Sequence, residues 1–223
     1  TKGKVFLLSD CTPDLTVQLE FLMDRCETLL LKTSPMLDLA AGIGELRYVA
    51  EIHCIAVQNE VKELLWILNK EAPDTPEIKT INITGSGNQK FNFSWQQDAI
   101  VTYAPPLRFL YEPNAAILKS GGYAQVATSY KLKKLHPHSH LFTSESLREF
   151  PGRRFSIEKI VPYTKQAMRD GINFEKANIT TRNFPERVAT IRKKWKIKEG
   201  GNTYLFFTTL ENEEKIMLIC AKV

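Results

Sequence analysis

The sequence predicts an open α/β sheet followed by a small α+β domain, and three observations support this. In the first half, apolar runs alternate with helical stripes, as in sheets built with crossover helices. The second half orders strands and helices as in a sheet with helices on one face. The net charge changes from −5 over residues 1–105 to +10 over residues 106–223. The change falls at Pro105-Pro106, which interrupts regular structure, so we place the domain boundary after residue 105.

Composition is that of an ordinary globular protein. The chain has 223 residues, of which 43% are hydrophobic and 25% charged, enough to bury a core. No apolar run approaches the ~18 residues of a membrane span, and no signal peptide is evident, so no membrane partner is expected. The first residue, Thr1, suggests a piece of a longer chain. Four scattered cysteines without a Cys-x-x-Cys pair indicate reduced thiols and a cytoplasmic location.

The first half yields seven expected elements. In chain order they are a strand over residues 4–9, a helix over 10–27 capped by Asp10 or Thr12, a strand over 28–32, a helix over 34–46, a strand over 51–58, a helix over 59–70 and a hairpin over 78–95. The runs at 28–32 and 51–58 are mostly apolar, which predicts parallel strands buried on both faces. The helix over 59–70 rests on a stripe of Val61, Leu64 and Leu65 at helical spacing.

Residues 36–44 read MLDLAAGIG and contain a Gly-x-Gly, as loops that bind AdoMet or a dinucleotide do. Such a loop needs a strand directly before it and a long helix after it. Pro35 precedes the supposed strand, and the next strand follows Gly44 too closely for a crossover helix. Apolar spacing instead predicts a helix with Ser34 as its N-cap and Asp38 in its first turn. The glycines therefore belong to a helix, and no cofactor-binding residue is predicted.

The second half is basic and mixes strands with short helices. Expected elements are two short helices within residues 112–130, a strand over 153–163, a helix over 164–171, a strand over 173–180, a helix over 183–197 capped by Asn183, and a hairpin over 203–223. Cations concentrate on or beside the last helix, with Arg153, Arg154 and Arg182 expected near it; the main ones are Arg187, Arg192, Lys193, Lys194 and Lys196. Such a cluster predicts RNA phosphate contacts, although a solvated helix face explains it equally well. Phe184 and Trp195 are expected in the core.

The stretch LHPHSHL raises the question of a metal site. His136, His138 and His140 would share one face of an extended chain. Zinc sites need three or four ligands on a rigid frame, and nothing nearby supplies the fourth. No metal site is therefore predicted. Nor does the sequence contain a Gly-x-Ser-x-Gly motif, a Walker loop or a Cys/His nucleophile pair.

Three motifs carry a family resemblance: KTSPMLD at 32–38, NE at 59–60 followed by ELL at 63–65, and YEPN at 111–114. With their surroundings they resemble the C-terminal portion of predicted class I AdoMet-dependent methyltransferases that end in a THUMP-like domain. The resemblance runs from Val5 to the final hairpin. It implies that the AdoMet loop and an Asp-Pro-type catalytic motif lie upstream. Residues 1–105 would then hold the later strands of a partial Rossmann-like sheet, and 106–223 the THUMP-like domain.

The resemblance also places candidate site residues. Lys32, Ser34 and Asp38 follow the carboxyl end of a strand, at the edge where open α/β sheets bind ligands, and are the catalytic candidates. Asn59 and Glu60 follow the next strand at the same edge and are substrate-binding candidates. Helix capping accounts for Ser34, Asp38, Asn59 and Glu60 equally well.

The sequence therefore predicts the C-terminal part of an AdoMet-dependent methyltransferase that acts on a structured RNA. AdoMet would be bound by the longer parent, and this chain alone would bind no cofactor. The alternative is a non-catalytic RNA-binding module on an α/β scaffold. A truncated sheet would expose an apolar edge strand, which favours self-association.

Overall fold

The structure is a computed structural model that describes residues 6–223, and it divides into two compact units. The first unit contains the described residues through Asp98 together with Asn114–Gly122. The second contains Ala99–Pro113 and Tyr123–Val223. These limits differ from the predicted boundary after residue 105. A strand was predicted over residues 4–9, of which residues 4 and 5 lie outside the described part of the chain. At the end of this segment, Leu8–Asp10 form a 3-10 helix, η1, and not a strand.

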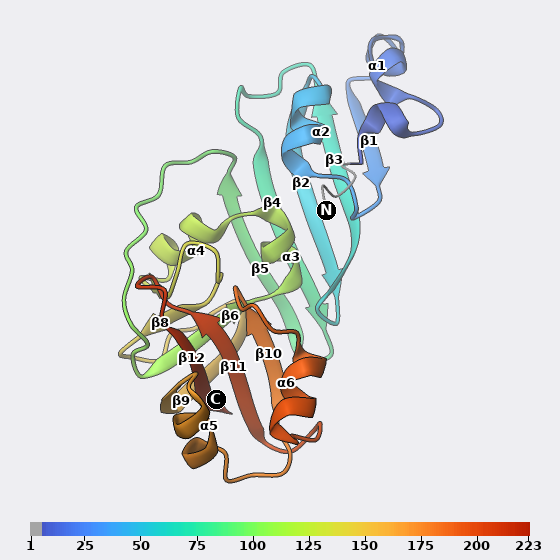
Figure 1. The fold of residues 1–223 in the computed structure, drawn as a ribbon. Coiled ribbons are helices and arrows are strands. Elements are labelled where there is room, and N and C mark those ends of the chain that lie inside the picture. Colours follow the sequence, from blue (N-terminus) through green and yellow to red (C-terminus); the bar gives the residue numbers. More distant parts are fainter. Residues whose placement is uncertain (1–5) are drawn as a thin grey trace. The chain divides into compact units, whose positions relative to one another are not determined.

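The first unit is a five-stranded sheet with the order β1-β3-β2-β4-β5 (Figure 1). Its elements are α1 (Leu15–Met23), β1 (Thr28–Thr33), α2 (Leu39–Glu45), β2 (Val49–Val57), β3 (Glu60–Asn69), β4 (Glu77–Thr84), β5 (Gly87–Ser94) and α3 (Ala115–Ser120). β3 is antiparallel to both of its neighbours, and β2 is parallel to β4. Therefore β1, β2 and β4 share one direction, and β3 and β5 run the opposite way. The hairpin predicted over residues 78–95 is confirmed as β4 and β5.

The helix predicted over residues 59–70 is wrong, because this segment is strand β3. β3 lies between β1 and β2, and its side chains are fully or partly buried on both faces from Val61 onward except at Lys62. Burial on both faces hides the period of two that marks a half-buried strand. Gln58 and Asn59 have positive φ angles of 49° and 64°, which form the tight turn of a hairpin. β1 and β2 are therefore parallel to each other but separated by β3.

Two further expectations for the first unit need correction. β1 is an edge strand whose side chains alternate between exposed and partly buried, and Leu30 is 60% exposed, so β1 is not buried on both faces. The predicted self-association through such an edge stays a prediction. Helix α1 is capped by Asp14, whose carboxylate accepts from the Thr16 N–H at 2.9 Å, rather than by Asp10 or Thr12.

The second unit is a seven-stranded sheet with the order β10-β11-β12-β9-β6-β8-β7. Its elements are β6 (Phe109–Pro113), α4 (Tyr123–Ser129), β7 (Lys133–Lys134), β8 (Phe142–Ser144), β9 (Gly152–Pro162), α5 (Lys165–Gly171), β10 (Asn178–Arg182), α6 (Val188–Trp195), β11 (Thr203–Thr209) and β12 (Lys215–Lys222). The predicted order from β9 to the final hairpin is confirmed. The prediction that Asn183 caps helix α6 is wrong, because the residue at the N-cap position is Arg187. Asn183 lies in the preceding turn, with a φ of 50°.

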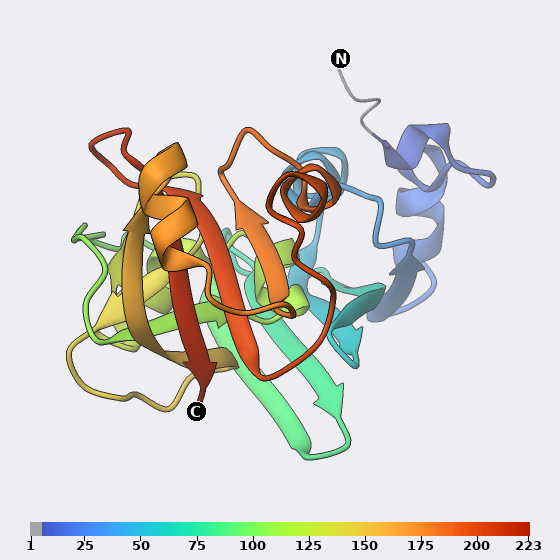
Figure 2. The same ribbon diagram turned by 60° about the horizontal axis from the view of Figure 1, so that its bottom comes forward.

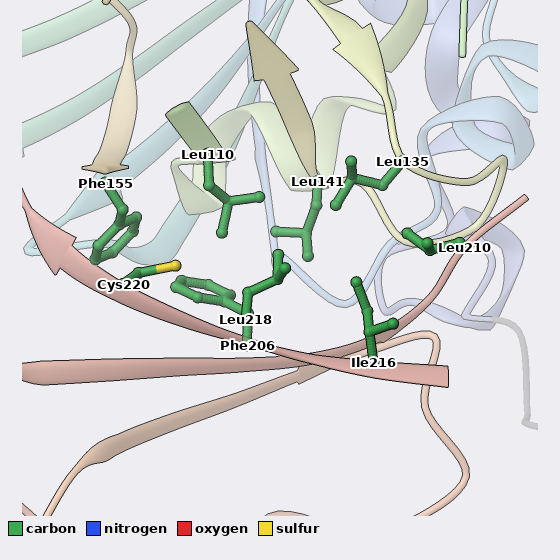
Figure 3. Close-up of a cluster of buried hydrophobic side chains, with 9 residues drawn as sticks. All are labelled: Leu110, Leu135, Leu141, Phe155, Phe206, Leu210, Ile216, Leu218 and Cys220. Carbon is green, nitrogen blue, oxygen red and sulfur yellow. The ribbon is translucent and has the colours of Figure 1, made fainter. Parts of the chain in front are cut away.

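Two apolar clusters cover the two faces of this sheet. Helices α5 and α6 lie on one face of the sheet (Figure 2). Their Met168 and Ile191 belong to the same buried cluster as Phe207 of β11. Phe206, the neighbour of Phe207 on β11, points to the other face and joins a second cluster (Figure 3). That second cluster contains Leu110, Leu135, Leu141, Phe155, Phe206, Leu210, Ile216, Leu218 and Cys220. Phe184 and Trp195 pack against the first cluster, which confirms their predicted place in the core. Across residues 6–223, every helix is too short or too polar for a transmembrane segment.

Candidate functional site

Of the predicted catalytic residues, Lys32 is the penultimate residue of β1, and Ser34 and Asp38 follow that strand. Lys32 is largely exposed, and its Nζ lies 3.0 Å from Glu63 Oε2 on β3. Ser34 Oγ accepts from the Met36 N–H at 3.2 Å and closes a turn. Asp38 is the N-cap of α2, because its Oδ1 accepts from the Ala41 N–H at 2.9 Å, so the assignment of Ser34 as the cap is wrong. Local hydrogen bonds thus account for Ser34 and Asp38, whereas the exposed ion pair of Lys32 is weak and leaves it accessible to a ligand.

Asn59 connects the β2–β3 turn to helix α3. Its side-chain Oδ1 accepts from the Ala115 N–H at 2.8 Å, and its backbone N–H donates to Asn82 Oδ1 at 2.9 Å. Gln89 Oε1 accepts from both Asn82 and Asn114, and Asn114 caps α3. The alternative in which Asn59 caps a helix of its own is therefore wrong.

Glu60, the neighbouring substrate-binding candidate, is exposed and pairs with Lys62 at 2.7 Å. The proposed substrate contacts of Asn59 and Glu60 stay predictions.

The glycines of residues 36–44 do not form a cofactor loop. Gly42 and Gly44 lie in α2, which confirms their predicted place in a helix. A Cβ atom on Gly42 would lie 2.4 Å from Trp66 Cη2, so Gly42 allows the helix to approach a buried indole. Gly42 therefore serves the packing of α2 against Trp66. These residues do not fit AdoMet, and we assign no reaction step to the cofactor within this chain.

The predicted cations around α6 divide into two groups. Arg192 Nη1 donates to the Ala177 and Ile197 carbonyls at 3.1 and 3.4 Å, which ties it to the fold. Lys194 Nζ donates to Glu186 Oε1 at 2.9 Å and to the Tyr163 hydroxyl at 3.2 Å, and these bonds raise the pKa of Lys194. In the described part of the chain, the remaining three have no side-chain hydrogen bond or ion pair; they are Arg187, Lys193 and Lys196.

A cleft of about 640 Å³ lies beside these cations. Four cations and two aromatic side chains line most of it: Lys165, Arg169, Lys194, Lys196, Tyr163 and Trp195. Because cations on an accessible surface attract polyanions, and only Lys194 of these four has an ion-pair partner within residues 6–223, this face has the charge that phosphate contacts require.

A second group of charges was missed by the sequence reasoning. Glu112 on β6 is buried, with a side chain only 4% exposed, and binds two arginines. Arg153 on β9 donates through Nε, at 2.7 Å, and Nη2 to Glu112 Oε2. Arg182 on β10 donates through Nε and Nη2 to Glu112 Oε1 at 3.1 and 2.9 Å. One signal was visible in the sequence, because Glu112 belongs to the YEPN motif of the family resemblance.

The contacts of these arginines also show that the second sheet is curved. β6 and β10 are four positions apart in the strand order, yet Glu112 and Arg182 are hydrogen-bonded (Figure 1). The sheet must therefore curve until these strands approach each other. Arg154 follows Arg153 along β9 and instead binds the exposed Glu149 at 2.7 Å. The expected nearness of Arg153, Arg154 and Arg182 to α6 stays a prediction.

The histidines of LHPHSHL differ in burial and in their partners. His136 is buried, and its Nδ1 lies 3.0 Å from Asn183 Nδ2. His138 is exposed, and His140 stacks on Tyr123 with ring centroids 3.7 Å apart. Within residues 6–223, no three His, Cys, Asp or Glu side chains are grouped as a metal site requires. Burial lowers the pKa of His140 to about 4, helped by the charges of Lys134, Arg182 and His138.

This depressed pKa predicts acid sensitivity. Between pH 6.5 and about 4, this histidine binds a proton in the unfolded chain but not in the folded chain. The contribution of neutral His140 to the stability of the folded state is therefore complete above pH 6.5 and is lost as the pH falls. Allowing for solvent screening, we expect a loss of about 1–2 kcal/mol. Urea unfolding at both ends of this range should show a weaker pH dependence for His140→Gln than for the unchanged chain. His138→Gln should change the pH dependence much less, because the charge of His138 is the smallest cause of the lowered pKa of His140. Equal pH dependence in all three proteins would contradict the prediction.

Comparisons with known proteins add two kinds of similarity. Residues 109–151 match a family described as a ferredoxin-like domain, and residues 152–222 match one described as THUMP domain-like. The chain is also 34% identical to a putative methyltransferase from Porphyromonas gingivalis W83, whose crystal structure aligns with a TM-score of 0.92. That alignment covers 98% of this chain and 57% of the other, so this chain spans a little over half of its relative. A comparison with curated proteins finds no match.

These similarities confirm the predicted fold class, an open α/β sheet followed by a small α+β domain. They also confirm the relation to methyltransferases at that coarse level. Residues 152–222 are thus similar to THUMP-like domains, and the chain as a whole is similar to a putative methyltransferase.

Proposed function

We propose that this chain is the C-terminal part of a class I AdoMet-dependent methyltransferase that acts on RNA, and that its second unit holds the RNA. The similarity over 98% of the chain to a putative methyltransferase carries the enzymatic part of the proposal. The THUMP-like match and the net charge of +10 over residues 106–223 support the RNA part. A cytoplasmic location without a membrane partner belongs to the same proposal.

AdoMet would supply the methyl group and would be held by residues of the longer parent, because both glycines lie in helix α2 and Gly42 serves its packing against Trp66. This chain alone is then inactive and binds RNA without cofactor. Lys32 is our main candidate for the edge of the substrate cleft, since its side chain is accessible at the end of β1. Ser34 and Asp38 would shape that edge through the turn and the cap they form. The packing role of Gly42 also favours the second candidate function, a non-catalytic RNA-binding module.

Structured RNA is expected to bind this chain with an affinity that falls as salt rises. Each phosphate contact releases counterions, so the slope of log K against log salt reports how many contacts form. Changing Arg187, Lys193 and Lys196 to alanine should reduce that slope by about 2–3 units. Fluorescence anisotropy between about 50 and 200 mM salt measures it.

A matched triple variant in the first unit tests whether the position of the charges matters. In this control, Lys62, Lys70 and Lys79 are changed to alanine, which removes the same amount of positive charge. These three lysines already form ion pairs, with Glu60, Asp24 and Glu51, respectively. This control should retain most of the slope. Binding independent of salt, or equal losses in both triple variants, would contradict the placement of RNA on the second unit.

A further inference from the structure

We infer that Arg153 and Arg182, held together by Glu112, form a phosphate-binding pair for RNA. The inference rests on the proposed RNA function and assigns one specific contact within it. It concerns residues on β6, β9 and β10, and it is separate from the cations on α6 that the sequence pattern emphasises.

The geometry leaves one end of each guanidinium free. Both arginines use Nε and Nη2 to bind Glu112, and Nη2 of Arg153 also reaches Thr180 Oγ1 at 3.3 Å. Nη1 of Arg153 and Nη1 of Arg182 have no acceptor within residues 6–223. Each Nη1 carries two N–H donors. Two unsatisfied donor groups are therefore fixed to a single carboxylate.

The two arginines are accessible to a ligand, whereas the carboxylate that holds them is not. The Glu112 side chain is 4% exposed, whereas the side chains of Arg153 and Arg182 are 38% and 33% exposed. Solvent thus reaches the arginines and not the carboxylate. Because folding already orders both arginines, a ligand binds them with little further loss of side-chain entropy.

The local charge favours an anion with one negative charge. Two guanidinium groups and one carboxylate leave a net charge of +1, which a phosphodiester balances. Arg182 acts electrostatically on His140 and Tyr123, and Lys134 adds a further positive charge near His140. Planar guanidinium donors suit the oxygens of phosphate, so RNA phosphate is the ligand class that the chemistry selects.

A purely structural role is the competing explanation, since Glu112 joins strands at distant positions of the sheet. Substitutions that retain charge separate the two explanations. Arg153→Lys and Arg182→Lys keep the positive charge but lose the planar fork. Arg154→Lys is the matched control, because Arg154 is the next residue on β9 and binds exposed Glu149 instead.

Glu112→Gln gives a test with opposite signs. If only the number of charges matters, removing this carboxylate makes the unit more positive and tightens RNA binding. If Glu112 positions the arginines, its loss weakens binding in spite of the added net positive charge. We expect a weakening of about fivefold.

The experiment is an anisotropy titration of the full chain with structured RNA, with circular dichroism to verify folding at the assay temperature. Arg153→Lys and Arg182→Lys should each weaken binding about tenfold, and Arg154→Lys less than about twofold. If Glu112→Gln does not fold, the two lysine variants decide. Wild-type affinity in both of them, or tighter binding by a folded Glu112→Gln, would overturn the pair and leave RNA binding intact.

Two further outcomes test the proposed function and identify the kind of phosphate that is bound. No RNA binding by the unchanged chain would overturn the proposed function and the pair together. RNA ending in a 5′-phosphate and RNA ending in a 5′-hydroxyl distinguish the source of the phosphate. Equal affinities with the expected losses support an internal phosphodiester, whereas a preference for the 5′-phosphate that disappears in Arg182→Lys supports a terminal phosphate.

Discussion

Replacing Glu112 with alanine is expected to lower the free energy of unfolding by about 3 kcal/mol. The buried carboxylate accepts hydrogen bonds from Arg153 and Arg182, and its removal leaves two like charges facing each other beside an apolar core. Both arginines are partly exposed, so water compensates for some of the lost contacts. The expected loss therefore lies at the lower end of the range for breaking a buried pair.

Urea unfolding followed by circular dichroism measures this loss, and amide hydrogen exchange in β9 and β10 assigns it to the second unit. Glu149→Ala is the control, because Glu149 is 94% exposed and binds Arg154, the next residue on β9. A surface pair of this kind contributes less than about 1 kcal/mol. A loss for Glu112→Ala no larger than that of the control would show that the two arginines need no anchor.

The second unit follows its sequence pattern closely from β9 onward, whereas its strands β6, β7 and β8 were not predicted and the first unit departs from its pattern at β3. From β9 to β12, strands and helices differ in length and are separated by clear turn residues, so each pattern has one interpretation. In the first unit, Val61, Leu64 and Leu65 fit a helical stripe, yet they lie in a central strand covered on both faces. The turn before it is Gln58-Asn59, which lacks the glycine that usually marks such a hairpin. Local residue order does not contain that information.

The candidate site shows a similar division. The charge excess of the second half is visible in the sequence, but contacts decide which cations are available. Arg192 and Lys194 are held by carbonyl oxygens and by Glu186, whereas Lys193 is not. Glu112 and Arg182 are 70 residues apart in the chain and meet only because the sheet curves. No spacing rule predicts such a pair, because it depends on the tertiary path of several strands.

The two glycines of α2 should respond in opposite directions to the same substitution. Gly42→Ala places a methyl group 2.4 Å from Trp66 Cη2, and the indole is fully buried with its Nε1 bound to Thr33 Oγ1 at 2.9 Å. Because the ring has little freedom to move, overpacking should cost about 2 kcal/mol in spite of the better helix propensity of alanine. Gly44→Ala meets no atom within 4 Å and should stabilise the chain by about 0.5–1 kcal/mol.

Urea unfolding of the two variants tests what the Gly-x-Gly is for. A cofactor loop would need both glycines for the close approach of a ligand, and neither alanine would then change the stability of the free chain in this opposed way. Opposite signs would show that Gly42 exists to seat a helix on Trp66 and that Gly44 is replaceable. If Gly42→Ala were as stable as Gly44→Ala, the contact between α2 and Trp66 would not constrain position 42, and the packing explanation for the motif would fail.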